Sequence, residues 1–125
     1  MLTRVLLVDD DNEDQEIFIQ QLARYYPGIE VISAYNGKDA LRMLSKSKPN
    51  YIFLDINMPG MNGMDVLKKI KEIHTTKDIP VFMYSTSDGF NSKPTAFDLG
   101  VMQYFRKPDS EHGFQRMFSE VFNRN

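Results

Sequence analysis

Short runs of apolar residues recur along the chain at intervals that are too long for β-hairpins. Three of the runs are continuous rather than alternating, which is typical of strands buried on both faces of a parallel sheet. A weaker run and a short run complete the set, and we expect the short one at an edge of the sheet. The predicted strands are Val5–Val8, Glu30–Ala34, Tyr51–Leu54, Val81–Tyr84 and Gln103–Arg106.

Apolar residues at helical spacing lie between the runs and after the last of them. The apolar positions are Phe18, Leu22, Tyr25 and Tyr26; Ala40, Leu41 and Leu44; Val66, Leu67, Ile70 and Ile73; and Phe114, Met117, Phe118, Val121 and Phe122. We interpret the last stripe as core rather than as a partner surface. The segment Ser87–Lys93 is polar, and Pro94 allows only a short helix before Leu99. Within that segment, Phe90 is either a loop anchor or an exposed partner contact.

The order of elements is therefore (βα)5, which predicts an α/β fold with a parallel sheet covered by helices on both sides. Crossovers between such strands are right-handed. Ligands of these sheets bind at the carboxyl ends of the strands. The residues that follow each apolar run are therefore the first place to look for a functional site.

Composition narrows the class of protein. The chain has 125 residues, of which 42% are hydrophobic and 26% charged, so one globular domain over 1–125 is expected. The net charge of −2 gives no electrostatic case for binding nucleic acid. There is no cysteine for a disulfide, a thiol nucleophile or a thiolate metal site. No apolar run is long enough for a membrane span or a signal peptide, and we expect a cytoplasmic protein.

An acidic segment, Asp9–Asp14, follows the first predicted strand, and five of its six residues are acidic. Acids at a helix N-terminus complement the helix dipole, which explains Asp11 to Asp14. This explanation fits Asp9 and Asp10 less well, because two carboxylates about 4 Å apart repel by roughly 4 kcal/mol at an effective dielectric constant near 20. A bound cation would remove that repulsion. Helix capping and metal binding both stay open for this segment.

A third acid, Asp55, follows the third predicted strand and precedes a loop that contains Pro59-Gly60. An Asp in this position is usually part of a turn. The strand would, however, place Asp55 at the same edge of the sheet as Asp9 and Asp10. Three carboxylates form an all-oxygen site suited to a hard cation such as Mg²⁺, and the chain offers neither cysteine nor a sequential histidine pair as softer ligands.

A hydroxyl and a lysine follow the last two predicted strands, at Ser85 and Lys107. Each is unremarkable alone, since hydroxyls often cap turns and lysines are usually solvated. Together with the three acids they form a set that fits phosphoryl chemistry. A carboxylate can be the nucleophile that forms an aspartyl phosphate, while a metal, a lysine and a hydroxyl stabilise the phosphoryl oxygens.

The sequence resembles the receiver domain of bacterial two-component response regulators. The motifs that carry the resemblance are Val5–Asp10, Leu54–Gly63, Ile79–Val81 with Ser85, and Lys107-Pro108. The loop after Asp55 is the most specific of them, and the resemblance covers essentially the whole chain. It implies a flavodoxin-like fold with strand order 2-1-3-4-5, an order that the periodicity alone does not show.

The resemblance also implies roles around a Mg²⁺ ion. Asp55 would be the phosphoacceptor, Asp10 a direct ligand of the metal and Asp9 a ligand acting partly through water. Asn57 would contribute its backbone carbonyl to the metal. Lys107 would pair with the phosphate.

Three further expectations concern switching. By the same resemblance, Ser85 would bind a phosphoryl oxygen, and Tyr104 would change rotamer as that hydroxyl moves. The alternative for Tyr104 is a half-buried tyrosine on an edge strand. The peptide bond between Lys107 and Pro108 is expected to be cis on resemblance alone, because only about 5% of bonds before proline are cis in folded proteins.

The implied function is a phosphorylation-activated signalling switch. A phosphohistidine on a sensor histidine kinase or a histidine phosphotransfer protein would donate to Asp55. A protein target would then read the face formed by the fourth helix, the fifth strand and the fifth helix, without contact to nucleic acid or membrane. No output domain follows within 1–125, so a stand-alone receiver that catalyses only its own phosphorylation and dephosphorylation is expected.

Two alternatives belong to other classes of function. One is a Mg²⁺-dependent phosphohydrolase that uses an aspartyl-phosphate intermediate, which generally needs a second acid two residues after the nucleophile. Asp9 is followed by Asp11 at that spacing, whereas Asp55 is followed by Asn57. The other is an interaction module that works without phosphorylation.

Overall fold

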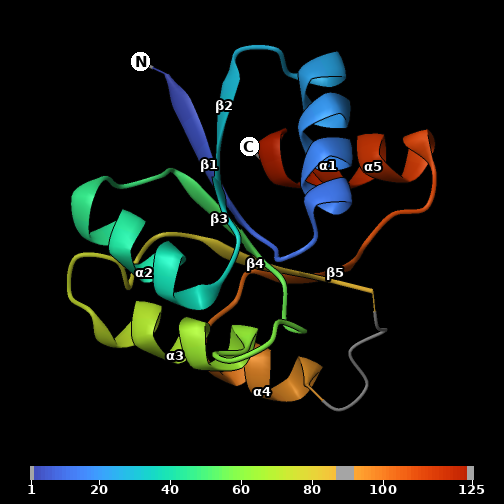
Figure 1. Cartoon of the computed structure of the whole chain (residues 1–125). Helices are drawn as coiled ribbons and strands as arrows, with labels where there is room; N and C mark the ends of the chain where they lie inside the picture. The colour runs from blue at the N-terminus through green and yellow to red at the C-terminus, as the bar shows by residue number, and fades with distance from the viewer. Residues whose placement is uncertain (1, 87–91, 124–125) are drawn as a thin grey trace.

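The computed structural model describes residues 2–86 and 92–123 of the chain. Strands and helices alternate throughout this part of the sequence, as predicted (Figure 1). The strands are β1 (Thr3–Val8), β2 (Ile29–Ala34), β3 (Tyr51–Leu54), β4 (Val81–Ser85) and β5 (Gln103–Arg106). The helices are α1 (Asn12–Tyr25), α2 (Gly37–Lys46), α3 (Gly63–Glu72), α4 (Lys93–Asp98) and α5 (Glu111–Phe122). Phe90 lies outside the described residues.

The strands form one parallel sheet in the order β2-β1-β3-β4-β5, which confirms the expected fold class and strand order. The last strand, β5, lies at one edge, as its short apolar run predicts. The first and third strands are neighbours, and Val8 is the register partner of Leu54. The chain segments that follow these two strands therefore start next to each other at the same edge of the sheet.

Alternating strand residues face two separate cores. The core under α1 and α5 is aromatic, and Phe18 of α1 lies at its centre. Its ring makes edge-on contacts with Phe53, Phe118 and Tyr84 at centroid distances of 5.0, 5.2 and 5.5 Å. The core under α2, α3 and α4 is built from aliphatic and methionine side chains together with Tyr104. Figure 1 shows α1 and α5 on one side of the sheet and α2, α3 and α4 on the other.

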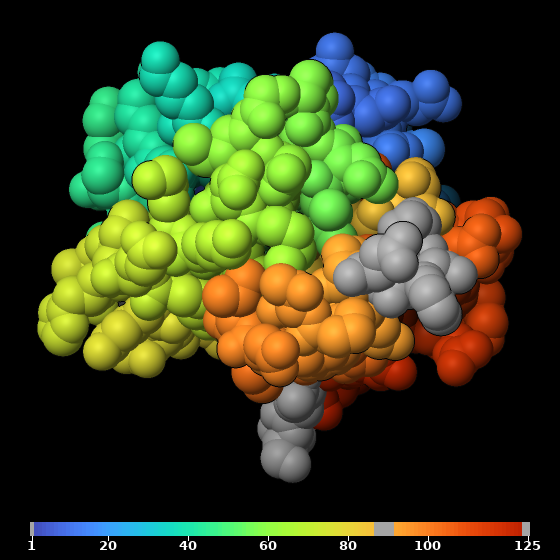
Figure 2. All heavy atoms as spheres, turned by 90° about the horizontal axis from the view of Figure 1, so that it is seen from below, coloured from blue at the N-terminus to red at the C-terminus, as the bar shows by residue number. Residues whose placement is uncertain are grey.

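Side-chain caps fix where four of the five helices begin. The capping residues are Asp11, Asn36, Asn62 and Ser110, and each accepts a hydrogen bond from a backbone N–H three residues later. Such a bond satisfies one of the free N–H groups of the first helical turn. The fourth helix has no side-chain cap and only six residues, with proline in its first turn, which confirms the prediction of a short helix. Figure 2 shows α4, in orange, beside the green segment that follows β3.

The expected cis bond before Pro108 is wrong. All peptide bonds of the described residues are trans. The expectation rested on resemblance alone, and the intrinsic preference of a bond before proline is for trans by about 0.5–1 kcal/mol.

None of the helices in residues 2–86 and 92–123 is long and apolar enough to cross a lipid bilayer. The longest, α1, has 14 residues and carries acidic residues in its first turn. A bilayer-spanning helix needs about 20 predominantly apolar residues.

Candidate functional site

The candidate site lies where β1 and β3 end. The backbone N–H of Asp9 donates to the carbonyl of Ala34 at 3.0 Å, and that of Asp55 donates to the carbonyl of Val8 at 2.9 Å. Each aspartate therefore extends the hydrogen bonding of the sheet by one residue. The two side chains are brought to the same edge by the backbone of neighbouring strands.

Asp10 completes a group of three carboxylates. Asp9, Asp10 and Asp55 each offer an oxygen within 4.8 Å of the others. Asp9 and Asp55 are buried, with 0% and 4% of their surfaces exposed, whereas Asp10 is exposed. Three clustered carboxylate oxygens with one side open to solvent fit a hard divalent cation that keeps some of its water, as Mg²⁺ does.

Burial makes the two inner carboxylates harder to ionise. Burial raises the pKa of Asp9, although contacts with Lys107 act in the opposite direction. Burial also raises the pKa of Asp55 to about 6, against the lowering effect of the Lys107 ammonium and with a further increase from Asp9. A cation bound by these carboxylates would favour their ionised forms.

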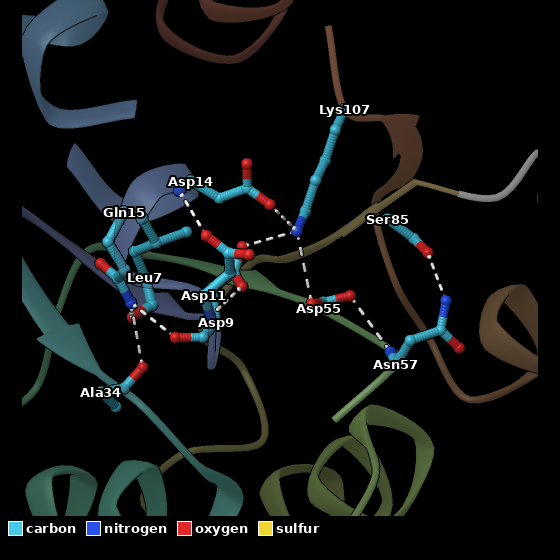
Figure 3. A network of polar contacts seen from close by, with 10 residues as sticks. All are labelled: Leu7, Asp9, Asp11, Asp14, Gln15, Ala34, Asp55, Asn57, Ser85 and Lys107. Atoms are coloured by element: carbon cyan, nitrogen blue, oxygen red, sulfur yellow. Dashed lines mark hydrogen bonds and ion pairs between the residues drawn. The ribbon is translucent and has the colours of Figure 1, made fainter. Parts of the chain in front are cut away.

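The ammonium of Lys107 lies among carboxylates that come from three parts of the chain (Figure 3). Its Nζ is 2.7 Å from Oδ2 of Asp9, 2.8 Å from Oδ2 of Asp14 and 3.4 Å from Oδ2 of Asp55. The ring of Tyr84 lies beside it, with its centroid 5.4 Å from Nζ. Burial alone would lower the pKa of Lys107, but the hydrogen bonds to Asp14 and Asp9 and the charge of Asp55 raise it overall.

Asn57 connects the remaining hydroxyl to the acidic group. Its backbone N–H donates to Oδ1 of Asp55 at 3.1 Å, and its side-chain amide donates to Oγ of Ser85 at 3.3 Å. Ser85 is fully buried at the end of β4. The structure thus brings Ser85 to the site through Asn57. The binding of a metal by the Asn57 carbonyl stays a prediction.

Tyr104 lies outside this group, on β5. It is buried, with 7% of its surface exposed, and its hydroxyl is 3.3 Å from Oγ of Ser92 just before α4. The side chain is therefore better covered than the expected half-buried edge tyrosine. A rotamer change of Tyr104 stays a prediction.

Two residues near the site were not recognised from the sequence. The helix dipole alone accounts for an acid at Asp14, yet its carboxylate pairs with Lys107. Gln15 is buried, and its Nε2 lies 3.2, 3.1 and 3.0 Å from the carbonyl oxygens of Leu7, Asp9 and Ala34, to which it donates. Gln15 stands three residues before Phe18 on the apolar stripe of α1, so a polar residue in a buried position was the available signal.

Asp11, the second acid in the phosphohydrolase alternative, serves as the N-cap of α1. Its Oδ1 accepts a hydrogen bond from the backbone N–H of Asp14 at 3.0 Å, and its own N–H donates to Oδ1 of Asp9 at 3.0 Å. This is the helix-capping role that acids in Asp11–Asp14 were expected to have.

A five-stranded parallel sheet with clustered acids, a hydroxyl and a lysine at the strand ends defines a receiver-type signalling domain. The chain matches the model of the response regulator receiver domain family over residues 5–118. It belongs to that family, and its fold is that of a phosphorylation-activated switch of two-component systems.

Curated relatives are longer proteins. The chain is 41% identical over 109 residues to a protein-glutamate methylesterase/protein-glutamine glutaminase of Desulfotalea psychrophila, covering 86% of this chain and 30% of that protein. It is 36% identical over 109 residues to the response regulator PleD of Caulobacter vibrioides, covering 86% of this chain and 23% of PleD. The chain thus spans less than a third of the length of either relative.

Solved structures confirm the fold over the whole chain. The phosphorylated cyanobacterial phytochrome response regulator RcpA superposes with a TM-score of 0.89 at 28% identity, covering 100% of this chain and 98% of RcpA. The Mn²⁺-bound form of the response regulator Rcp1 superposes with a TM-score of 0.84 at 28% identity, covering 96% of this chain and 93% of Rcp1. The chemotaxis protein CheY4 of Vibrio cholerae superposes with a TM-score of 0.85 at 25% identity, covering 98% of this chain and 100% of CheY4.

Proposed function

We propose that this receiver accepts a phosphoryl group on Asp55 from a phosphohistidine donor, in a reaction that needs Mg²⁺. The observation that carries the proposal is the position of Asp55, which is buried beside the Lys107 ammonium and clustered with the carboxylates of Asp9 and Asp10. The similarity to a phosphorylated RcpA and to a Mn²⁺-bound Rcp1 supports both the modification and the divalent cation.

In the proposed reaction, a carboxylate oxygen of Asp55 forms a bond to phosphorus, and the bond between phosphorus and the donor imidazole nitrogen breaks. Asp9, Asp10 and Asp55 would hold the cation, which supplies positive charge to the transferring phosphoryl oxygens. Lys107 would pair with one of those oxygens, and the Ser85 hydroxyl would donate a hydrogen bond to another.

The donor would be a sensor histidine kinase or a histidine phosphotransfer protein in the cytoplasm. Residues 1–125 would act as one receiver unit with no other enzymatic activity. A protein target would read the phosphorylated form on the surface of α4, β5 and α5. The hydrogen bond between the hydroxyls of Tyr104 and Ser92 connects β5 to the start of α4, two elements of this surface, and a shift of Ser85 would be transmitted through it.

The proposal is tested by intact-protein mass spectrometry after incubation with acetyl phosphate and Mg²⁺. We expect a gain of one phosphoryl group that disappears with EDTA and in Asp55→Asn. The matched control is Asp65→Asn, at an exposed acid in the first turn of α3, which should still be modified. No gain in the wild-type protein, together with no binding of beryllofluoride, would contradict the proposal, as would full modification of Asp55→Asn.

The phosphohydrolase alternative predicts many turnovers of a small phosphate ester. The capping role of Asp11 leaves that alternative without an obvious second acid. We therefore expect phosphate release from p-nitrophenyl phosphate to stay at the background rate. An interaction module that works without phosphorylation predicts equal binding of the protein target by the wild-type protein and by Asp55→Asn.

A further inference from the structure

The contacts of Lys107 are unequal. The two shortest join Nζ to Asp9 at 2.7 Å and to Asp14 at 2.8 Å, whereas the contact with Asp55 is 3.4 Å. The ammonium that would pair with a phosphoryl group on Asp55 is therefore held more closely by two other carboxylates. Figure 3 shows Lys107 between Asp14 on one side and Asp55 on the other.

The position of Asp14 is fixed by its helix. Asp14 lies in the first turn of α1, and its backbone N–H donates to the capping side chain of Asp11 at 3.0 Å. The side chain of the next residue, Gln15, donates hydrogen bonds to carbonyls at the ends of β1 and β2, and the ring of Phe18 packs in the aromatic core. The backbone of Asp14 is thus held in place and would not follow Lys107 if the ammonium moved toward Asp55.

The charges around Lys107 do not balance. Asp9, Asp10, Asp14 and Asp55 offer four carboxylates against one ammonium, a formal excess of three negative charges. A divalent cation held by Asp9, Asp10 and Asp55 would compensate two of their three negative charges. Asp14 is not part of that group and has a side chain that is 32% exposed, so its charge would be left to compete for the lysine.

We infer that Asp14 is a positioning residue that holds Lys107 away from the phosphoacceptor and so weakens the phosphorylated state. The inference rests on the proposed function. Two effects of the Asp14 carboxylate both weaken the phosphorylated state. It attracts the ammonium that the phosphoryl group needs, and it repels the phosphoryl group itself.

The test measures the affinity of beryllofluoride, which imitates a phosphoryl group on an aspartate, at saturating Mg²⁺ by isothermal titration calorimetry. Asp14→Asn keeps the size of the side chain and removes its charge. We expect it to bind beryllofluoride about fivefold more tightly than the wild-type protein, as suits a partly exposed charge pair. Asp14→Glu keeps the charge and should bind within about twofold of the wild-type protein.

The matched control is Glu13→Gln, which removes a neighbouring, exposed charge from the same helical turn. We expect an affinity within about twofold of the wild-type value. A similar gain in Glu13→Gln would show a general field effect and overturn the inference. Equal or weaker binding by Asp14→Asn would overturn it too, and Asp14→Ser is a second neutral variant if Asp14→Asn fails to fold.

A structural role for Asp14 would alter thermal stability without this selective gain, so the melting temperature of each variant is measured in parallel. The Nζ resonance of ¹⁵N-labelled Lys107 gives a second readout, and it should shift in Asp14→Asn but not in Glu13→Gln before any ligand is added. If beryllofluoride binds the wild-type protein but no more tightly to Asp14→Asn, only this inference fails. If beryllofluoride binds none of the proteins, this inference fails, and the proposed function fails as well if acetyl phosphate also leaves the wild-type protein unmodified.

Discussion

A β-carbon on Gly63 would overlap the backbone carbonyl oxygen of Asp55. The first residue of α3 therefore packs directly against the residue that follows β3. The backbone N–H of Gly63 also donates to the carbonyl of Ile56 at 2.9 Å. The start of α3 and the proposed phosphoacceptor are thus held together by backbone contact, and glycine is needed for that close approach.

Replacing this glycine should disturb both folding and the site. Gly63→Ala must push α3 away from Asp55, and we expect the free energy of unfolding to fall by about 1–3 kcal/mol, as for other overpacked positions. Urea denaturation measures the loss. Gly28→Ala is the control, because a β-carbon there meets no atom within 4 Å, and equal stability of the two variants would contradict the packing argument.

The raised pKa of Asp55 predicts how stability depends on pH without divalent cations. The folded protein holds the proton up to a pKa of about 6, whereas the reference carboxyl has a pKa of 3.8. The free energy of unfolding therefore falls as pH rises from about 4 to about 6, and the full penalty is present above that range. In EDTA at pH 7 we expect Asp55→Asn to be about 1–3 kcal/mol more stable than the wild-type protein.

This advantage should shrink as pH is lowered toward 4, where the wild-type carboxyl is protonated. Mg²⁺ should also reduce it, by stabilising the wild-type protein. Thermal melts at several pH values, with EDTA or Mg²⁺, measure both trends. Asp109→Asn, at an exposed acid just before α5, is the control. Its stability relative to the wild-type protein should change neither with pH nor with Mg²⁺. An Asp55→Asn variant that is less stable than the wild-type protein at pH 7 in EDTA would refute the argument from burial.

The aromatic core should be intolerant of truncation at its centre. Phe18 is fully buried and contacts three other rings, so we expect Phe18→Ala to cost about 3–5 kcal/mol of unfolding free energy. Phe97→Ala removes an equally large ring that is 43% exposed on α4 and should cost less than about 1 kcal/mol. Guanidinium denaturation of the two variants checks the difference, which would vanish if Phe18 were peripheral.

The contact between Tyr104 and Ser92 should appear as an energetic coupling. Tyr104→Phe and Ser92→Ala should each lower the free energy of unfolding by about 0.5–1.5 kcal/mol. The double variant should cost less than the sum, because both changes remove the same hydrogen bond. Tyr35→Phe, at an exposed tyrosine after β2 at the opposite edge of the sheet from β5, should be additive with Ser92→Ala. If the costs of Tyr104→Phe and Ser92→Ala added up in the double variant, the two hydroxyls would not be coupled in solution.

Much of the fold could be predicted because buried parallel strands are continuous apolar runs and helices repeat every 3.6 residues. The order of the strands could not be read from that periodicity, which says nothing about neighbours, and it came from the resemblance. The same resemblance gave the wrong isomer before Pro108.

The candidate site shows a similar division. Asp9, Asp10, Asp55 and Lys107 follow strands and Ser85 ends one, so the rule for parallel sheets placed them at one edge. The role of Asp14 could not be inferred in this way, because it depends on a lysine 93 residues later in the sequence. The helix dipole gave a sufficient local explanation, and only the packing of α1 against the sheet showed the second partner.

The two cores have no buried side chain in common, and the sheet separates them completely among the described residues. Substitutions under α2, α3 and α4 can therefore accumulate during evolution with little effect on the rings under α1 and α5. This separation also suggests a route for protein engineering, in which the helices of the aliphatic side are exchanged for those of another receiver while the aromatic side is retained as a stable scaffold.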